Sequence, residues 1–195
     1  MAPKNKKSLL KTIIIAVFFA VIVLVYYFSL NHSASNEKKS NNISEKEELM
    51  QYDMIADYPK TPRETVKLHC RYYKLLYNSD LTDEEIVDLN KKMMKLYSSE
   101  LLSYNTESVM VNSIKDDIKK VEEEGYSYKA FTLPETSQIT RYEQNGVNMA
   151  SMEVTVTVGT KEKTGYVYQQ YVLVEEEGQW KIYGWGQSQS QPQKE

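Results

Sequence analysis

The chain has 195 residues, 41 % of them hydrophobic, with 24 Lys and Arg against 27 Asp and Glu. This composition is typical of a globular protein and excludes collagen-like and fully disordered chains. One cysteine cannot form an intramolecular disulfide, so a cystine-stabilised fold is excluded too. The first eleven residues carry four lysines and no acid, which leaves 20 basic and 27 acidic residues in the remainder. Because nucleic-acid binding needs clustered positive charge, we expect no nucleic-acid partner.

A long apolar segment follows the lysines. Residues 12–30 carry no charge and would span about 28 Å as a helix, close to the ~30 Å hydrocarbon core of a bilayer. Tyr26 and Tyr27 lie near its end, where aromatic rings favour the membrane interface. We therefore predict a transmembrane signal anchor that binds the lipid bilayer. The alternative is a cleaved signal peptide, for which Ser33-Ala34-Ser35 is a weak cleavage site.

The charges around this segment predict its orientation. Because the lysines precede it, the positive-inside rule places residues 1–11 in the cytoplasm and the C-terminal domain outside the cell. Residues 31–43 are rich in Asn, Ser and Lys with almost no large apolar side chain, which predicts a flexible linker. We divide the rest into a short helix at 44–57, a folded domain at 58–186 and a disordered polar tail at 187–195.

Three Ser/Thr-x-x-Glu patterns predict helix starts at Ser44, Thr61 and Thr82. Each places a hydroxyl at the N-cap and a carboxylate three residues later, which together satisfy two backbone N–H groups. Apolar residues at helical spacing follow. The predicted helices cover residues 62–77, 83–97 and 106–124, in addition to the short helix at 44–57.

After Gly125 the apolar period changes from 3.6 to 2, which indicates strands. Asn145-Gly146 is typical of a two-residue hairpin turn. The extended segments cover residues 126–133, 136–144, 148–158, 166–174 and 180–185, which predicts four to five antiparallel strands. Because the helices precede the strands, we predict an α+β fold in which helices pack on one face of a curved antiparallel sheet.

The last predicted strand lies in residues 178–185, which read GQWKIYGW. Helices followed by such a sheet and ending resemble the nuclear transport factor 2-like superfamily, whose domains wrap a bent sheet around an N-terminal helix as a cone. Residues 58–68, YPKTPRETVKL, behind an anchor also resemble an uncharacterised domain-of-unknown-function family of membrane-anchored Gram-positive bacterial proteins. The resemblance covers about residues 58–186. It implies the cone-like fold and no particular activity.

Enzymes of that superfamily use Asp/His or Asp/Tyr groups inside the cone, so the histidines need attention. His32 lies in the linker, and His69 has no carboxylate three or four residues away, so the helix offers no paired metal ligand. Its neighbour Cys70 points about 100° away, a poor geometry for a nucleophilic pair. The chain also contains no phosphate-binding loop and no Gly-x-Ser-x-Gly motif. We therefore predict no metal site and no cofactor.

The chain has 16 tyrosines, whose rings could either line a binding surface or fill the core of a small cone. Glu153 is predicted on the strand face opposite the apolar residues, where exposure to water is the alternative to a binding role. Our candidate ligand- or partner-binding residues are His69, Tyr73, Tyr77, Tyr128, Glu153, Tyr168 and Trp185.

The sequence favours a non-catalytic, extracytoplasmic binding or interaction domain on a single-pass cell-membrane protein. Its expected partner is an envelope or cell-surface protein. The alternative is a small-ligand carrier or an enzyme that uses the cone cavity. An open polar pocket containing His69 or Glu153 would favour that alternative, whereas a core filled by Tyr, Met and Val would favour the binding domain.

Overall fold

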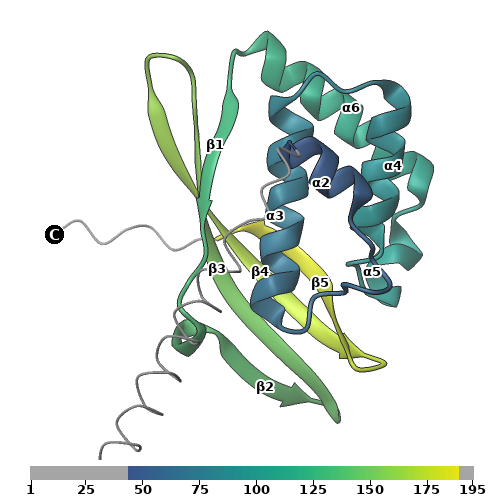
Figure 1. The fold of residues 1–195 in the computed structure, drawn as a ribbon. Coiled ribbons are helices and arrows are strands. Elements are labelled where there is room, and N and C mark those ends of the chain that lie inside the picture. Colours follow the sequence, from purple (N-terminus) through teal and green to yellow (C-terminus); the bar gives the residue numbers. More distant parts are fainter. Residues whose placement is uncertain (1–43, 189–195) are drawn as a thin grey trace, which may run out of the picture. The chain divides into compact units, whose positions relative to one another are not determined.

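The computed structural model describes residues 44–188, which form five α-helices followed by a five-stranded antiparallel sheet (Figure 1). The helices are α2 (Glu45–Gln51), α3 (Pro62–Asn78), α4 (Asp83–Met94), α5 (Ser99–Tyr104) and α6 (Glu107–Glu123). The strands are β1 (Ser127–Thr132), β2 (Thr140–Gln144), β3 (Val147–Gly159), β4 (Thr164–Glu176) and β5 (Gln179–Gln187). The predicted α+β class, with helices before strands, is confirmed.

The predicted signal anchor at residues 12–30 lies outside the described residues, as do the basic tail at 1–11, the linker at 31–43 and nearly all of the polar tail. Within residues 44–188, none of the helices has both the length and the apolar character that a membrane span requires.

All three predicted capping boxes are present, at the starts of α2, α3 and α4. At α3, for example, the Thr61 hydroxyl accepts from the Glu64 N–H, and the Glu64 carboxylate accepts from the Thr61 N–H. The helix ends differ from the prediction in two places. Helix α2 ends at Gln51 because the Asp53 carboxylate accepts from the Ile55 and Ala56 N–H groups and turns the chain.

Helix α4 ends at Met94, before the predicted end at 97, because the chain then pairs with β5. The Ile182 N–H donates to the Leu96 carbonyl at 2.7 Å, and the Ser98 N–H donates to the Ile182 carbonyl at 2.9 Å. The short helix α5 follows and was not predicted. Its start is held by a residue far along the chain, since the Glu176 carboxylate accepts from the Ser99 N–H and hydroxyl.

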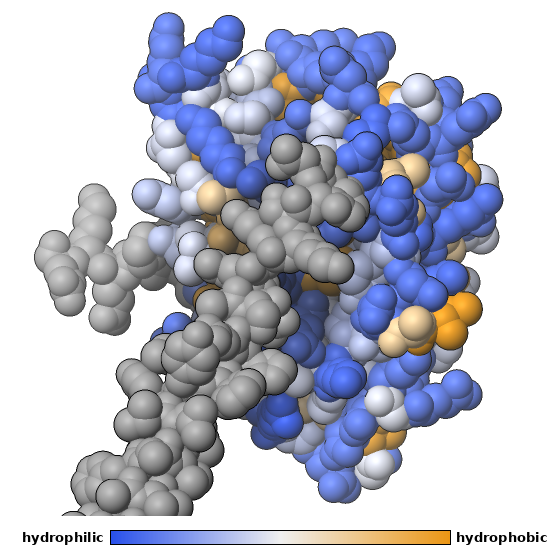
Figure 2. All heavy atoms as spheres, viewed as in Figure 1, coloured by the Kyte–Doolittle hydropathy of each residue, from blue (hydrophilic) through white to orange (hydrophobic). Residues whose placement is uncertain are grey.

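The sheet has the strand order β1-β3-β4-β5, and β2 pairs with the first half of β3. Helix α3 contacts both β1 and β5, so the sheet curves around this helix. Helices α4 and α6 pack against α3 and against each other (Figure 1). Hydrophilic residues cover most of the outward side of these two helices in the view of Figure 2. Helix α3 is therefore the centre of the domain.

The two faces of the sheet differ as the period-2 pattern predicted. On β3, Ala150, Met152, Val154 and Val156 are buried on the face toward the helices. The other face carries the predicted candidate Glu153, which pairs across the ladder with Gln170, and Tyr168, which pairs with Thr155. These two candidates thus lie on the side of the sheet away from α3.

At both β1 and β5, backbone groups on the outer edge are satisfied by something other than a strand. At β1, the Asn78 side chain accepts from the Tyr128 N–H and donates to the Tyr128 carbonyl. At β5, the Leu96 carbonyl accepts from the Ile182 N–H, and the Ser98 N–H donates to the Ile182 carbonyl. An amide side chain and a loop therefore occupy positions that a neighbouring strand would take.

Candidate functional site

His69 lies on α3 at the centre of the core and is fully buried. Its Nδ1 is 3.1 Å from the Tyr171 hydroxyl on β4, and its Nε2 is 3.0 Å from the Tyr97 hydroxyl in the loop after α4. Burial lowers the pKa of His69 to about 3, so the imidazole is neutral at physiological pH. Both ring nitrogens are thus used inside the protein.

The hydrogen bonds of this group can be assigned, because a neutral imidazole has one donor and one acceptor nitrogen. The Tyr171 hydroxyl lies 3.4 Å from Gln169 Oε1, to which it donates. Tyr171 then accepts from His69 Nδ1–H, and Tyr97 donates to His69 Nε2. This assignment gives each hydroxyl hydrogen an acceptor and leaves His69 no free nitrogen for catalysis.

Aromatic rings enclose the imidazole. The Trp185 ring is stacked on Tyr97, with centroids 5.3 Å apart, and on Tyr171, with centroids 6.3 Å apart. The Tyr73 ring lies 4.7 Å from the imidazole. We call His69, Tyr73, Tyr97, Tyr171 and Trp185 the histidine cluster. It is a filled core and not a cavity.

Cys70, the neighbour of His69, is also buried, with its Sγ 3.8 Å from the Tyr171 hydroxyl. Burial raises the pKa of this thiol to about 11, against a smaller opposing effect of the Tyr171 hydroxyl. A thiol that stays protonated and has no access to solvent is a poor nucleophile. Cys70 is therefore an unreactive buried residue, in agreement with the poor geometry for a nucleophilic pair that the sequence predicted.

An open groove lies beside this cluster, between α3, α6 and the strands β1, β3 and β4. Its volume is about 440 Å³, within the range of small-ligand sites. We call it the tyrosine groove. It is lined by Tyr73, Tyr77, Asp117, Lys120, Val121, Glu124, Tyr126, Ser127, Tyr128, Val156, Val158, Val167 and Gln169.

The end of α6 positions one wall of the tyrosine groove. Gly125 adopts a φ of +67°, a conformation that glycine takes without strain, and the Tyr126 N–H donates to the Val121 carbonyl at 2.9 Å. This turn brings the half-exposed Tyr126 ring against the groove, two residues after the exposed Glu124. The helix predicted at residues 106–124 thus ends within one residue of its predicted end.

The groove combines an apolar wall with charges at its rim. Exposed Asp117 and Lys120 on α6 lie 4.0 Å apart, so these two charges partly offset each other. Burial, and then the nearby charge of Asp117, raise the pKa of Tyr77 well above its usual value. A second hollow of about 400 Å³ adjoins the groove, and Tyr77 and Tyr128 line both. The surface open to a ligand therefore continues past these two rings.

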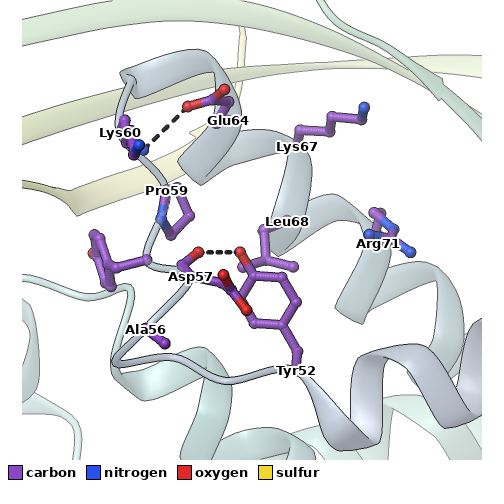
Figure 3. Close-up of a pocket in the computed structure, with 10 residues that line it drawn as sticks. Tyr52, Ala56, Asp57, Pro59, Lys60, Glu64, Lys67, Leu68 and Arg71 are labelled. Atoms are coloured by element: carbon purple, nitrogen blue, oxygen red, sulfur yellow. Dashed lines mark hydrogen bonds between the residues drawn. The ribbon is translucent and has the colours of Figure 1, made fainter. Parts of the chain in front are cut away.

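A different groove, of about 420 Å³, lies where the loop after α2 meets α3 (Figure 3). Tyr52 lies beside Leu68 there, and its hydroxyl donates to the Asp57 carbonyl. The Glu64 carboxylate accepts from the Lys60 and Thr61 N–H groups. Most polar groups of this groove therefore hold the loop in place.

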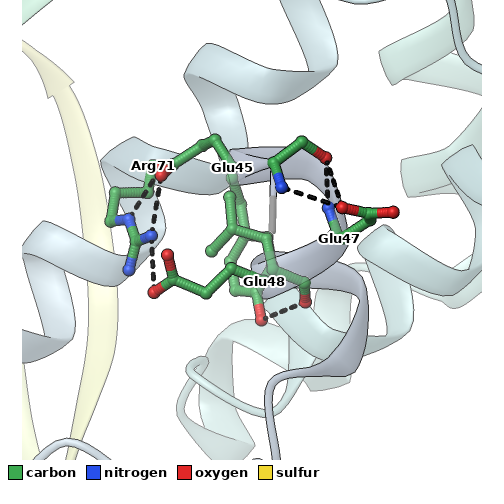
Figure 4. Close-up of polar contacts among 7 residues, drawn as sticks. Glu45, Glu47, Glu48 and Arg71 are labelled. Carbon is green, nitrogen blue, oxygen red and sulfur yellow. Dashed lines mark hydrogen bonds and ion pairs between the residues drawn. The ribbon is translucent and has the colours of Figure 1, made fainter. Parts of the chain in front are cut away.

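Arg71, which also lines this groove, holds α2 against α3 (Figure 4). Its Nε is 2.8 Å from Glu45 Oε1, and its guanidinium also reaches Glu48 at 2.9 Å. The hydrogen bond and charge of Arg71 lower the pKa of Glu45, although partial burial opposes this effect. Because its charge is already paired twice, Arg71 offers little to an anionic ligand. The tyrosine groove is the better candidate site.

The predicted site residues fall into three places. Tyr73, Tyr77 and Tyr128 line the tyrosine groove, and Tyr73 also contacts His69. His69 and Trp185 belong to the histidine cluster, and Glu153 and Tyr168 lie on the opposite face of the sheet. Within residues 44–188 no group of three or more His, Cys, Asp or Glu side chains is arranged to hold a metal ion.

Sequence reasoning missed the α6 wall of the groove, namely Asp117, Lys120, Val121 and Glu124. The charges of Asp117, Lys120 and Glu124 indicate a solvated helix face, which is the ordinary interpretation of such residues. The position of α6 in the chain could have predicted these residues. A helix that ends at a glycine directly before the first strand must place its last turn beside that strand.

A family model for a domain of unknown function, DUF6715, matches residues 1–185. The chain belongs to the DUF6715 family. This confirms the prediction of a domain of unknown function, and the family name assigns no activity. Neither this match nor the structural one below names the nuclear transport factor 2-like superfamily.

Among solved structures, the crystal structure of the intermembrane space region of the chloroplast protein ARC6 matches 66 % of this chain and 98 % of that chain. The two share 12 % sequence identity, and the TM-score is 0.30, which does not establish a common fold. Comparison with curated proteins finds no match.

Proposed function

We propose that this member of the DUF6715 family is a membrane-anchored protein whose residues 44–188 form a non-catalytic binding domain outside the cell. The observation that carries the proposal is the contrast between an open tyrosine groove and an enclosed His69. The ligand enters the groove, and an envelope or cell-surface protein is the partner that supplies or receives it. The sheet curved around α3 supports the cone-like architecture of the nuclear transport factor 2-like resemblance.

The chemistry of the groove supports binding. Valines from α6, β3 and β4 provide an apolar wall, and tyrosines provide large rings with polar tips, a combination that suits molecular recognition. His69 and Glu153, the histidine and the carboxylate among the predicted candidates, could act in catalysis only where substrate can reach them. The His69 nitrogens are both bonded to tyrosines, and Glu153 lies on the other face of the sheet. Neither residue can therefore act in the groove.

The binding role can be tested with methyl NMR of the purified full-length chain during titration with small apolar and aromatic fragments. We expect the methyl signals of Val121, Val158 and Val167 to shift, while those of Leu49 and Leu89 in the core stay in place. A Val167→Trp variant, which fills the groove, should abolish the shifts. Fragments that bind this variant as well as the parent chain, or that shift no groove signal, would refute the role.

The membrane arrangement needs a separate experiment. Protease added to intact cells should cut within residues 31–43 and release a fragment that contains the folded domain. A chain that is protected until the membrane is opened would place the domain on the cytoplasmic side. A chain that is released from membranes without any protease would contradict the anchor at residues 12–30.

A further inference from the structure

The rings and charges of the tyrosine groove indicate a class of ligand. We infer that the groove binds an organic cation with an apolar body, such as an alkylated ammonium. This inference rests on the proposed function, because it names the ligand of the same groove. It comes from three features that face one space: four tyrosine rings, carboxylates at the rim and a wall of valines.

The tyrosines come from two directions. Tyr73 and Tyr77 lie one turn apart on α3, with ring centroids 5.6 Å apart. On the other side, Tyr126 directly precedes β1 and Tyr128 is the second residue of that strand. The face of an aromatic ring carries partial negative charge and attracts a cation within about 6 Å. Several rings around one space form an aromatic cage, which suits an alkylated ammonium whose charge is spread over a bulky head.

The carboxylates add a second attraction for a cation. Asp117 and Glu124 both line the groove from α6, and Lys120 lies between them. Lys120 is 4.0 Å from Asp117, whereas within the described part of the chain no cation lies within ion-pair distance of Glu124. Glu124 therefore offers a whole negative charge beside the tyrosines. The adjoining hollow is lined by two acidic residues, Asp80 and Glu122, and by one basic residue, Lys129. Negative charge therefore exceeds positive charge there too.

The valines define the rest of the ligand. Val121, Val156, Val158 and Val167 give the groove an apolar wall that no small hydrated cation would use. A ligand with an alkyl or ring body covers this wall and gains affinity with each methylene that leaves water. A cationic head and an apolar body thus match the two halves of the groove. A carboxylate-bearing ligand would instead meet Asp117 and Glu124 with like charge.

The test uses three probes that share one hexyl chain and differ in head charge: hexyltrimethylammonium, 1-hexanol and heptanoate. Binding to the full-length chain is measured by saturation-transfer NMR, with detergent alone as the blank. We expect the cation to bind at least tenfold more tightly than the alcohol, and heptanoate to bind most weakly. Equal binding of all three probes would overturn the cation inference but leave the proposed function standing. Binding of none would overturn both.

Variants then assign the preference to particular groups. Glu124→Gln should reduce the advantage of the cation over hexanol about fivefold and leave hexanol binding unchanged. Tyr126→Leu should also reduce it, because the leucine keeps an apolar side chain but removes the ring. The matched control is Glu123→Gln, since Glu123 is an exposed neighbour outside the groove. A cation preference that survives Glu124→Gln and Tyr126→Leu, or falls equally with Glu123→Gln, would refute the assignment.

Discussion

The histidine cluster and the tyrosine groove are built from similar residues on the same helix, yet one is closed and the other is open. Tyr73 belongs to both, because its ring contacts His69 and also lines the groove. In the cluster, Trp185 covers the imidazole and both ring nitrogens have partners. In the groove, the tyrosines face α6 across a space of about 440 Å³ that no side chain fills.

This difference shows that residue type alone does not separate a core from a binding site. Tyrosine supplies area and a polar tip in both regions. What differs is the partner opposite each ring. A tryptophan and an imidazole fill the space in the cluster, whereas α6 presents charged side chains at the rim of the groove. The cluster should therefore control stability and the groove should control binding, which the following predictions test from the largest effect to the smallest.

Trp185→Ala should have the largest effect, because it removes the ring that stacks on Tyr97 and Tyr171 and touches His69. We expect a loss of about 3 kcal/mol in the free energy of unfolding, at the lower end for a tryptophan because Trp185 is only half-buried. Urea denaturation of the full-length chain measures this loss. A change below about 1 kcal/mol would show that the cluster is not the stabilising core.

His69→Gln should change how stability depends on pH. The folded-state pKa of about 3 lies below the ordinary value of 6.5, so the unfolded chain binds the proton first as pH falls. Stability from neutral His69 is complete above about pH 6.5 and decreases as pH drops toward 3. Between pH 7 and 5 the parent chain should lose about 2 kcal/mol.

The His69→Gln variant is less stable at pH 7 but should lose much less between pH 7 and 5. Glutamine can still meet both tyrosine hydroxyls and carries no proton to titrate. Urea titrations of both chains at the two pH values supply the comparison. Parallel losses in the two chains would mean that other groups cause the pH dependence.

Thr61→Ala should cost about 1 kcal/mol by removing the hydroxyl that caps α3, the helix that carries both regions. Thr61→Ser keeps the hydroxyl and should cost much less. Thermal unfolding of the three chains is a sufficient measurement. If serine and alanine destabilise α3 equally, the capping box is not what holds the start of this helix.

Tyr126→Ala should have the smallest effect on stability, within about 0.5 kcal/mol, because its ring is 48 % exposed. It should nevertheless weaken fragment binding to the groove severalfold. The control is Tyr166→Ala, since Tyr166 is 64 % exposed and lies on the opposite face of the sheet. Comparable losses of binding in the two variants would contradict the distinction between groove and surface.

Local chemistry made much of this fold predictable. The capping boxes at Ser44, Thr61 and Thr82 each depend on residues within one turn, and the Asn145-Gly146 hairpin depends on two neighbours. Helix α5 was missed because its N-cap, Ser98, has no Glu three residues later, and because the other contact at its start comes from Glu176, 77 positions from Ser99. Contacts at that separation leave no periodic pattern in the sequence.

The candidate site was only partly predictable for the same reason. Tyr73, Tyr77 and Tyr128 were chosen as aromatic residues of the expected cone, and they do line the groove. Nothing local distinguishes them from Trp185, which completes the core instead. The choice between pocket and core depends on how α6 packs across α3, and the charged face of α6 gave no sign of it.

The occupied edges of the sheet have a consequence for how this protein can associate with others. Strand addition joins chains by matching the free N–H and C=O groups of an edge strand. Asn78 takes those groups of Tyr128 on β1, and Leu96 and Ser98 take those of Ile182 on β5. Copies of this domain are thereby protected against edge-to-edge aggregation at these two positions. Association through side chains, which leaves these hydrogen bonds intact, stays open to them.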